Sequence, residues 1–203
     1  MTRYLLVASI LALATACGGN GSSNPAQPKL GAVIDRMGRA GVNTAVTNPF
    51  DLVSGKSIDQ TKDDYNANGD PTTWSQYAPQ FAKSLAVLDS LDGTCGNQLL
   101  AKPASGATIP ADRYLGLAGV LADDQLYVNT GSTTCQVYLG VEANATNAVP
   151  NSDCGGRTPL ENTIDETYSL LAIGATSGVT NGITMDTDHQ ASLTAFPFLQ
   201  PPN

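Results

Sequence analysis

Residues 158–174, TPLENTIDETYSLLAIG, carry the clearest helix signal in this chain. Thr158, Pro159 and Glu161 suit the N-cap, N1 and N3 positions of a capping box, which predicts that a helix begins there. Apolar residues then recur at steps of three and four, which places them on one face. Gly174 favours a C-terminal stop. The face expected to be buried consists of Leu160, Ile164, Tyr168 and Leu171.

Two further helices are predicted upstream, over residues 72–91 and 110–122. Both show the three-to-four periodicity of an amphipathic helix. Pro79 is expected to bend the first helix or delay its start, whereas a proline and an aspartate suit the opening turn of the second. The predicted apolar stripes are Trp74, Tyr77, Phe81, Leu85 and Leu88 in the first helix, and Tyr114, Leu117 and Leu121 in the second.

Two strands are predicted between the last two helices, over residues 124–130 and 135–141. Apolar residues alternate with residues of the other face in both, and residues 131–134 read as a hairpin turn. Residues 65–71 and 143–156 are predicted loops. Together these elements predict an α+β fold, in which about three helices pack on a β-hairpin or small antiparallel sheet within a single domain of residues 30–203.

The first 16 residues are predicted to be a secretory signal peptide. Residues 5–16 are uncharged and rich in Leu and Ala, and this stretch is shorter than the roughly 20 residues that span a bilayer. Ala14 and Ala16 supply the small residues that a signal peptidase needs. The chain is therefore expected to be exported.

Cys17 follows directly, and GGNGSSN occupies residues 18–24. This arrangement resembles the signal peptides of bacterial lipoproteins, although Ala14 stands where that pattern prefers Leu. The resemblance implies lipidation of Cys17, a flexible tether over residues 17–29 and attachment to the membrane. Gly18 hints at sorting to the outer membrane. The alternative is ordinary cleavage after Ala16, which leaves Cys17 available for a disulfide.

The cysteine count bears on the same choice. The chain contains four cysteines, so lipidation of Cys17 leaves three, and export permits a disulfide among them. Cys135 and Cys154 are the preferred pair, because they would close a loop over a polar connection. Without lipidation, two disulfides in three connectivities stay open.

The charge of the chain narrows the classes of partner. It carries 10 Lys and Arg against 18 Asp and Glu, for a formal net charge of −8. An acidic chain with no basic cluster is a poor partner for nucleic acid or an anionic lipid surface. Since export and the tether place the chain in the cell envelope, the partner expected besides the membrane is an envelope protein.

One segment resembles the beginning of a calcium-binding loop. Asp64, Asn66, Asn68 and Asp70 place oxygen-bearing side chains at alternate positions, and Gly69 permits a sharp turn. Ser75 stands where a bidentate Glu would complete the loop. These four residues are candidate Ca²⁺ ligands, whereas the alternative is an Asn/Gly turn that caps the next helix.

Candidate catalytic groups are few. His189 is the single histidine, and the chain contains no Gly-x-Ser-x-Gly elbow to accompany it. The cysteines lack the short spacings of a zinc site, and neither a phosphate-binding loop nor a dinucleotide fingerprint occurs. We therefore expect a non-catalytic binding or structural module, with a calcium-stabilised domain and a hydrolase as alternatives.

Several separate segments carry a family resemblance: RMGRAGVNT at residues 36–44, LADDQLYV at 121–128, CGGRTP at 154–159 and FPFL at 196–199. They resemble the C-terminal part of a bacterial family known as domain of unknown function 4331. Longer members carry a His- and Asp-rich opening region that is not seen here. The resemblance implies an exported domain and brings no reaction with it.

Overall fold

The computed structural model describes residues 36–147, 150, 152–159 and 161–182. The chain divides into units of residues 1–31 and 32–203, and every described residue belongs to the second. The predicted signal peptide, Cys17, the tether and His189 lie outside the described residues.

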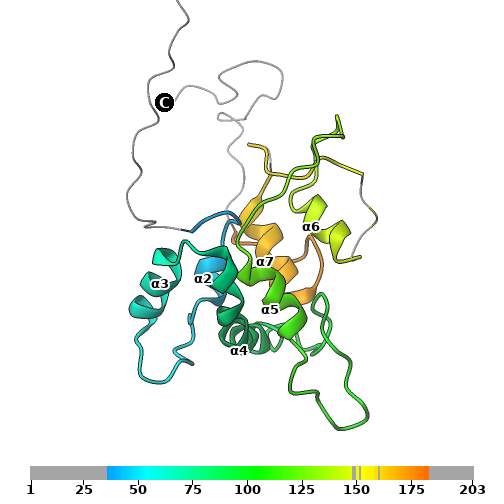
Figure 1. The fold of residues 1–203 in the computed structure, drawn as a ribbon. Helices are drawn as coiled ribbons and strands as arrows, with labels where there is room; N and C mark the ends of the chain where they lie inside the picture. Colours follow the sequence, from blue (N-terminus) through cyan, green and yellow to red (C-terminus); the bar gives the residue numbers. More distant parts are fainter. Residues whose placement is uncertain (1–35, 148–149, 151, 160, 183–203) are drawn as a thin grey trace, which may run out of the picture. The chain divides into compact units, whose positions relative to one another are not determined.

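The described residues form a series of helices (Figure 1). In chain order these are α2 (Val42–Val46), α3 (Ile58–Ala67), the 3-10 helix η2 (Pro71–Tyr77), α4 (Ala78–Leu88), α5 (Leu115–Ala122), α6 (Gly140–Ala145) and α7 (Thr163–Ile173). None of the helices in this part of the chain has both the length and the apolar composition of a membrane-spanning segment.

The predicted α+β fold and its hairpin are wrong, because the described residues contain isolated bridges and no strand. The two segments predicted to pair with each other bond to residues 153 and 154 instead. Asn129 N of the first segment donates to the Cys154 carbonyl over 2.7 Å, and Gln136 N of the second donates to Asp153 Oδ2 over 2.9 Å. Leu139 then adopts a φ of 59° and begins α6, which ends the extended alternation.

The predicted helix over residues 72–91 consists of two elements. Pro79 occupies the first turn of α4, where its missing N–H costs no helical hydrogen bond, and the chain before it winds as η2. The prediction that this proline delays the α-helix is confirmed. Asp70 caps η2 by accepting from Thr72 N.

The other two predicted helices begin later than expected. Residues 110–114 form turns, because the Arg113 carbonyl accepts from Lys102 N and the Arg113 Nε donates to the Lys102 carbonyl. In the third, Asn162 caps α7 by accepting from Asp165 N. Thr158 and Glu161 form a separate turn upstream. Gly174 ends α7 with a φ of 67°, as predicted.

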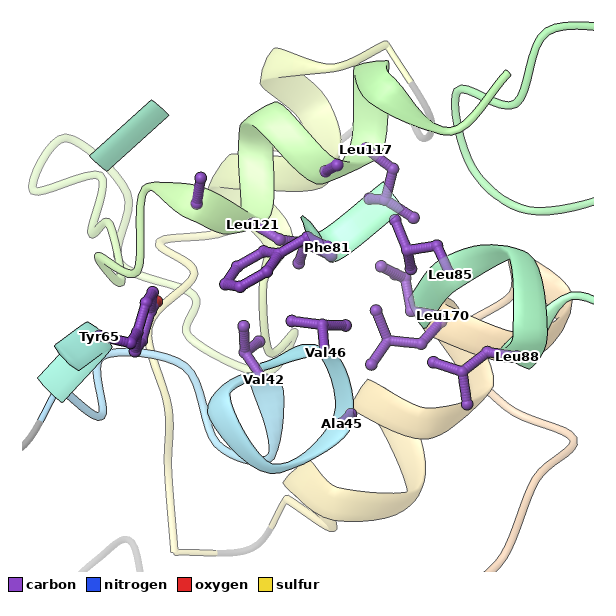
Figure 2. Packing of buried hydrophobic residues seen from close by; sticks show 13 residues of the cluster. Val42, Ala45, Val46, Tyr65, Phe81, Leu85, Leu88, Leu117, Leu121 and Leu170 are labelled. Atoms are coloured by element: carbon purple, nitrogen blue, oxygen red, sulfur yellow. The ribbon is translucent and has the colours of Figure 1, made fainter. Parts of the chain in front are cut away.

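The core gathers apolar side chains from five helices, with α4 packed against α2, α5 and α7 (Figure 2). The largest buried members are Tyr65 of α3, Phe81, Leu85 and Leu88 of α4, Leu117 and Leu121 of α5, and Leu170 and Leu171 of α7. The Ser84 hydroxyl donates to the Val46 carbonyl over 2.9 Å, so the one buried serine of α4 has its partner inside the core.

A candidate ligand-binding cleft

The segment before α2 is held against the end of α5 by a close approach of two backbones. A Cβ at Gly38 would lie 2.1 Å from the Asp124 carbonyl oxygen, so this position requires glycine. The approach brings Arg39 N to within 2.8 Å of Asp124 Oδ1. Burial raises the pKa of the Asp124 carboxyl, while this N–H and the guanidinium groups of Arg36 and Arg39 oppose the shift.

Arg36 fixes the same segment from the other side. Its guanidinium lies between two aromatic rings, 3.9 Å from the centroid of Tyr65 and 3.8 Å from that of Trp74. It also donates to the carbonyls of Tyr65 and Ala122. Cation–π contacts and charged hydrogen bonds strengthen in a desolvated setting. Arg36 therefore ties α3, η2 and α5 together and positions Arg39.

Arg39 and Glu142 form a buried ion pair. The Arg39 Nε lies 3.7 Å from Glu142 Oε1, and the two side chains are 3% and 8% exposed. Arg39 Nη1 donates to the Val120 carbonyl over 2.6 Å, and Tyr127 N donates to Glu142 Oε1 over 2.9 Å. The second carboxylate oxygen, Glu142 Oε2, is buried without a hydrogen-bond partner. Arg39 Nε likewise lacks a hydrogen-bond partner, and burying such charged groups without one is costly.

The ion pair lies in the lining of an open cleft of about 560 Å³ between α5 and α6. Gly116, Gly119 and Val120 of α5 line one wall, and Val141 and Ala145 of α6 line the other. A second cavity of about 30 Å³, with mostly leucine walls, shares Arg39, Val120, Glu142 and Thr146 with the cleft. A concave, mainly apolar space with a few polar groups is typical of a small-molecule site.

Asp123 and Tyr127 complete the polar side of the cleft lining. The Tyr127 hydroxyl donates to Asp123 Oδ2 over 2.7 Å, and Gln125 Nε2 donates to Asp123 Oδ1 over 2.8 Å. The hydrogen bond to Asp123 raises the pKa of Tyr127, with burial adding to the shift. Both oxygens of Asp123 therefore have donors, whereas only Oε1 of Glu142 has one.

A disulfide-closed loop supports the α6 side of the cleft. Cys135 and Cys154, the pair preferred from the sequence, are joined with their Cα atoms 4.8 Å apart. The neighbouring Gly155 has a φ of 66°, and a Cβ there would lie 2.8 Å from Val141 Cγ2 and 3.3 Å from the Tyr127 carbonyl oxygen. The loop therefore lies directly behind two residues that line the cleft.

The four candidate calcium ligands lie at the end of α3 and in the turn that follows, and each has a separate partner. Asp64 pairs with Lys56, and Asn66 Oδ1 accepts from Asn43 Nδ2 over 2.5 Å. Asn68 Oδ1 accepts from Asp70 N, and Asp70 Oδ1 accepts from Thr72 N. Across the described residues, no group of three or more His, Cys, Asp and Glu side chains is placed to hold a metal ion. Calcium binding stays a prediction.

The Arg39–Glu142 pair was not predicted from the sequence, because the two residues lie far apart along the chain and meet only through folding. The segments 36–44, 121–128 and 154–159, each quoted above as a distinct motif, all meet around the cleft. The polar residues in these segments were the only feature of the sequence that could have indicated a shared site. Cys95 is exposed with a free thiol and lies outside this set.

Comparison with known proteins gives no match to this chain among protein-family models, curated proteins or solved structures. The resemblance to the family of unknown function described above therefore stays a prediction.

Proposed function

We propose that this chain is an exported, non-catalytic binding module of the bacterial cell envelope, attached to the membrane through a lipid on Cys17. Its binding site is the cleft between α5 and α6. The observation that carries the proposal is this open cleft, whose lining contains the buried Arg39–Glu142 pair. An apolar space with a few fixed polar groups is typical of a site for a small molecule.

Export is supported by two independent features. The apolar, small-residue leader before Cys17 is typical of secreted proteins. The disulfide between Cys135 and Cys154 is typical of oxidising compartments outside the cytosol. The Gly/Ser/Asn stretch after Cys17 suits a flexible tether, so the module is placed close to the membrane and to partner proteins of the envelope.

Anchoring is tested by expressing the full chain in a bacterium that is fed an alkyne-tagged fatty acid. We expect the wild-type protein to carry the label and to be found in the membrane fraction. The Cys17→Ser variant should lose both the label and the membrane association. Cys95→Ser is the matched control, because it removes an exposed thiol elsewhere. Equal labelling of the Cys17→Ser variant would contradict lipidation at this residue.

Binding in the cleft is tested with N-phenyl-1-naphthylamine, a neutral fluorophore whose emission rises in apolar surroundings. Gly119 lines the cleft and a Cβ there meets no atom within 4 Å, so Gly119→Phe is chosen to place a ring in the cleft. We expect saturable fluorescence with the wild type and its loss in Gly119→Phe. Ala86→Phe places the same ring at an exposed position of α4 and should bind normally. Equal fluorophore binding by both variants would refute the cleft as the binding site.

A further inference from the structure

We propose that Phe196 and Phe198 of this chain dock in the cleft between α5 and α6 and compete there with an external ligand. The docking needs only the cleft, whereas the competition rests on the proposed binding function. Three observations carry the inference: an apolar face of α5 that is exposed, an uncharged aromatic stretch of the sequence outside the described residues, and a connection long enough to join the two.

The face of α5 that points away from the core is apolar and exposed. This helix reads LGLAGVLA and contains no polar side chain. Its buried members are Leu117, Ala118, Leu121 and Ala122. On the other side, Leu115 is 41% exposed, and Gly116 and Gly119, which line the cleft, are exposed as well. A helix that is apolar all round is expected to be covered all round, so this face suits an apolar occupant.

The remainder of the lining sets no charge requirement on that occupant. The apolar residues that α5 and α6 contribute are glycine, alanine and valine, which leave room for larger rings in a cleft of about 560 Å³. The charged groups pair within the protein, Arg39 with Glu142 and Asp123 with Tyr127. An uncharged, aromatic segment therefore fits the cleft without disturbing these pairs.

Residues 190–203, QASLTAFPFLQPPN, provide such a segment and lie outside the described residues. They contain no Asp, Glu, Lys or Arg, and they hold two of the four phenylalanines of the chain. Pro197 disfavours a helical Phe196 and favours an extended one. Residues two apart in an extended chain point to the same side, so the sequence predicts the rings of Phe196 and Phe198 on one face. Each ring is stabilised by leaving water for an apolar surface.

The connection to the described residues is long enough for this docking. Asn181 N donates to Asp165 Oδ1 over 2.8 Å, which places the last described residues beside the start of α7. Further along α7, the Thr167 hydroxyl donates over 2.8 Å to the carbonyl of the residue after Arg39, which lines the cleft. From the last described residue to Phe196 the chain spans up to about 45 Å when extended. A segment tethered in this way acts at a local concentration of about millimolar, which favours it over a free ligand.

Photocrosslinking tests the docking directly. Phe198 is replaced by p-benzoylphenylalanine in the full chain carrying Cys17→Ser, and the irradiated protein is reduced and digested with trypsin. Residues 114–157 contain no Lys or Arg before the last position, so one tryptic peptide carries both α5 and α6. We expect crosslinks to α5 or α6 within one molecule, and their loss in Gly119→Phe. Crosslinks to other segments, crosslinks to a second copy of the chain, or the absence of any crosslink would overturn the proposal.

Fluorophore titration tests the competition. Phe196→Ser/Phe198→Ser should bind N-phenyl-1-naphthylamine about fivefold more tightly than the wild type, because the apparent Kd is the intrinsic value divided by the fraction of molecules with an open cleft. Phe50→Ser is the matched control, since Phe50 is 39% exposed and does not line the cleft, and its affinity should equal that of the wild type.

The proposed function and this inference fail differently. Saturable fluorophore binding with equal affinity in the wild type and in Phe196→Ser/Phe198→Ser overturns the competition and keeps the binding cleft. Crosslinks to α5 and α6 without fluorophore binding by either protein overturn the proposed binding function and the competition with it, and keep the docking.

Discussion

Removal of the disulfide between Cys135 and Cys154 is expected to destabilise the protein and to loosen one wall of the cleft. The bridge closes a loop with a sequence separation of 19 residues. Restricting the unfolded chain over a loop of that length contributes about 3 kcal/mol to the free energy of unfolding. For a domain of this size the loss corresponds to a fall in melting temperature of about 10 °C.

Urea unfolding at pH 7 measures this loss, with the wild type compared with Cys135→Ala/Cys154→Ala. The midpoint should fall while the slope rises, since the unfolded variant exposes more surface once the bridge is gone. Cys95→Ser is the control, because the Cys95 thiol is exposed and unbridged, and its midpoint should equal that of the wild type. Fluorophore affinity should also fall in the double variant, since Gly155 lies against Val141 and Tyr127.

Two results would refute this reasoning. An unchanged urea midpoint in the double variant would mean that the hydrogen bonds of the Cys154 backbone already restrain the loop. An intact fluorophore affinity together with a lowered midpoint would mean that the loop stabilises the domain without shaping the cleft.

Other substitutions give opposite or graded effects on stability. Gly119→Ala should raise the free energy of unfolding by about 1 kcal/mol, because alanine favours the helix and the new Cβ meets open space. Gly38→Ala should lower the free energy of unfolding by about 2 kcal/mol, because its Cβ would overlap a backbone carbonyl. Equal melting temperatures for Gly119→Ala and Gly38→Ala would contradict both predictions. Arg36→Met should lower the free energy of unfolding by about 2 kcal/mol and alter tryptophan emission, since the guanidinium between the two rings is lost; unaltered emission would argue against the stack. Burial, and then the nearby Glu161 carboxylate, raise the pKa of Glu166. Its contribution to stability is therefore present below about pH 4 and lost as the pH rises through the raised pKa, so Glu166→Gln should gain on the wild type between pH 4 and pH 7 in urea titrations; a constant difference would refute it.

The helices that the sequence predicts well are those with a local apolar period. The stripe of Phe81, Leu85 and Leu88 in α4 is buried as expected, and so are Leu117 and Leu121 in α5. A helix that buries one face against a core repeats its apolar residues at a fixed step, and that step can be read without knowledge of the partner. The position of Gly174 at the end of α7 follows in the same way from local backbone preference.

The helix α3 illustrates what the apolar period misses. It is largely polar and buries Thr61 and Tyr65 alone, so no stripe marks it. Its start is nevertheless marked by a capping box, in which Ser57 and Gln60 bond each other's backbone N–H. Residues 65–71 were predicted to be a loop from their Asn, Asp, Gly and Pro content, but α3 continues to Ala67.

The failed hairpin and the missed ion pair share a different cause. Alternation in residues 124–130 and 135–141 is compatible with strands, but Asn129 N bonds to the Cys154 carbonyl and Gln136 N to the Asp153 carboxylate instead of to each other's segment. Arg39 and Glu142 likewise meet through packing of distant segments. Sequence patterns within one segment cannot predict a contact that depends on how another segment packs against it.

The contacts of Arg36 also bear on how the domain responds to a pulling force. A pull on the chain ahead of α2 reaches the guanidinium first, which is stacked between Tyr65 and Trp74 and bonded to the Ala122 carbonyl. We therefore expect such a force to be shared among α3, η2 and the end of α5 rather than borne by a single helix end.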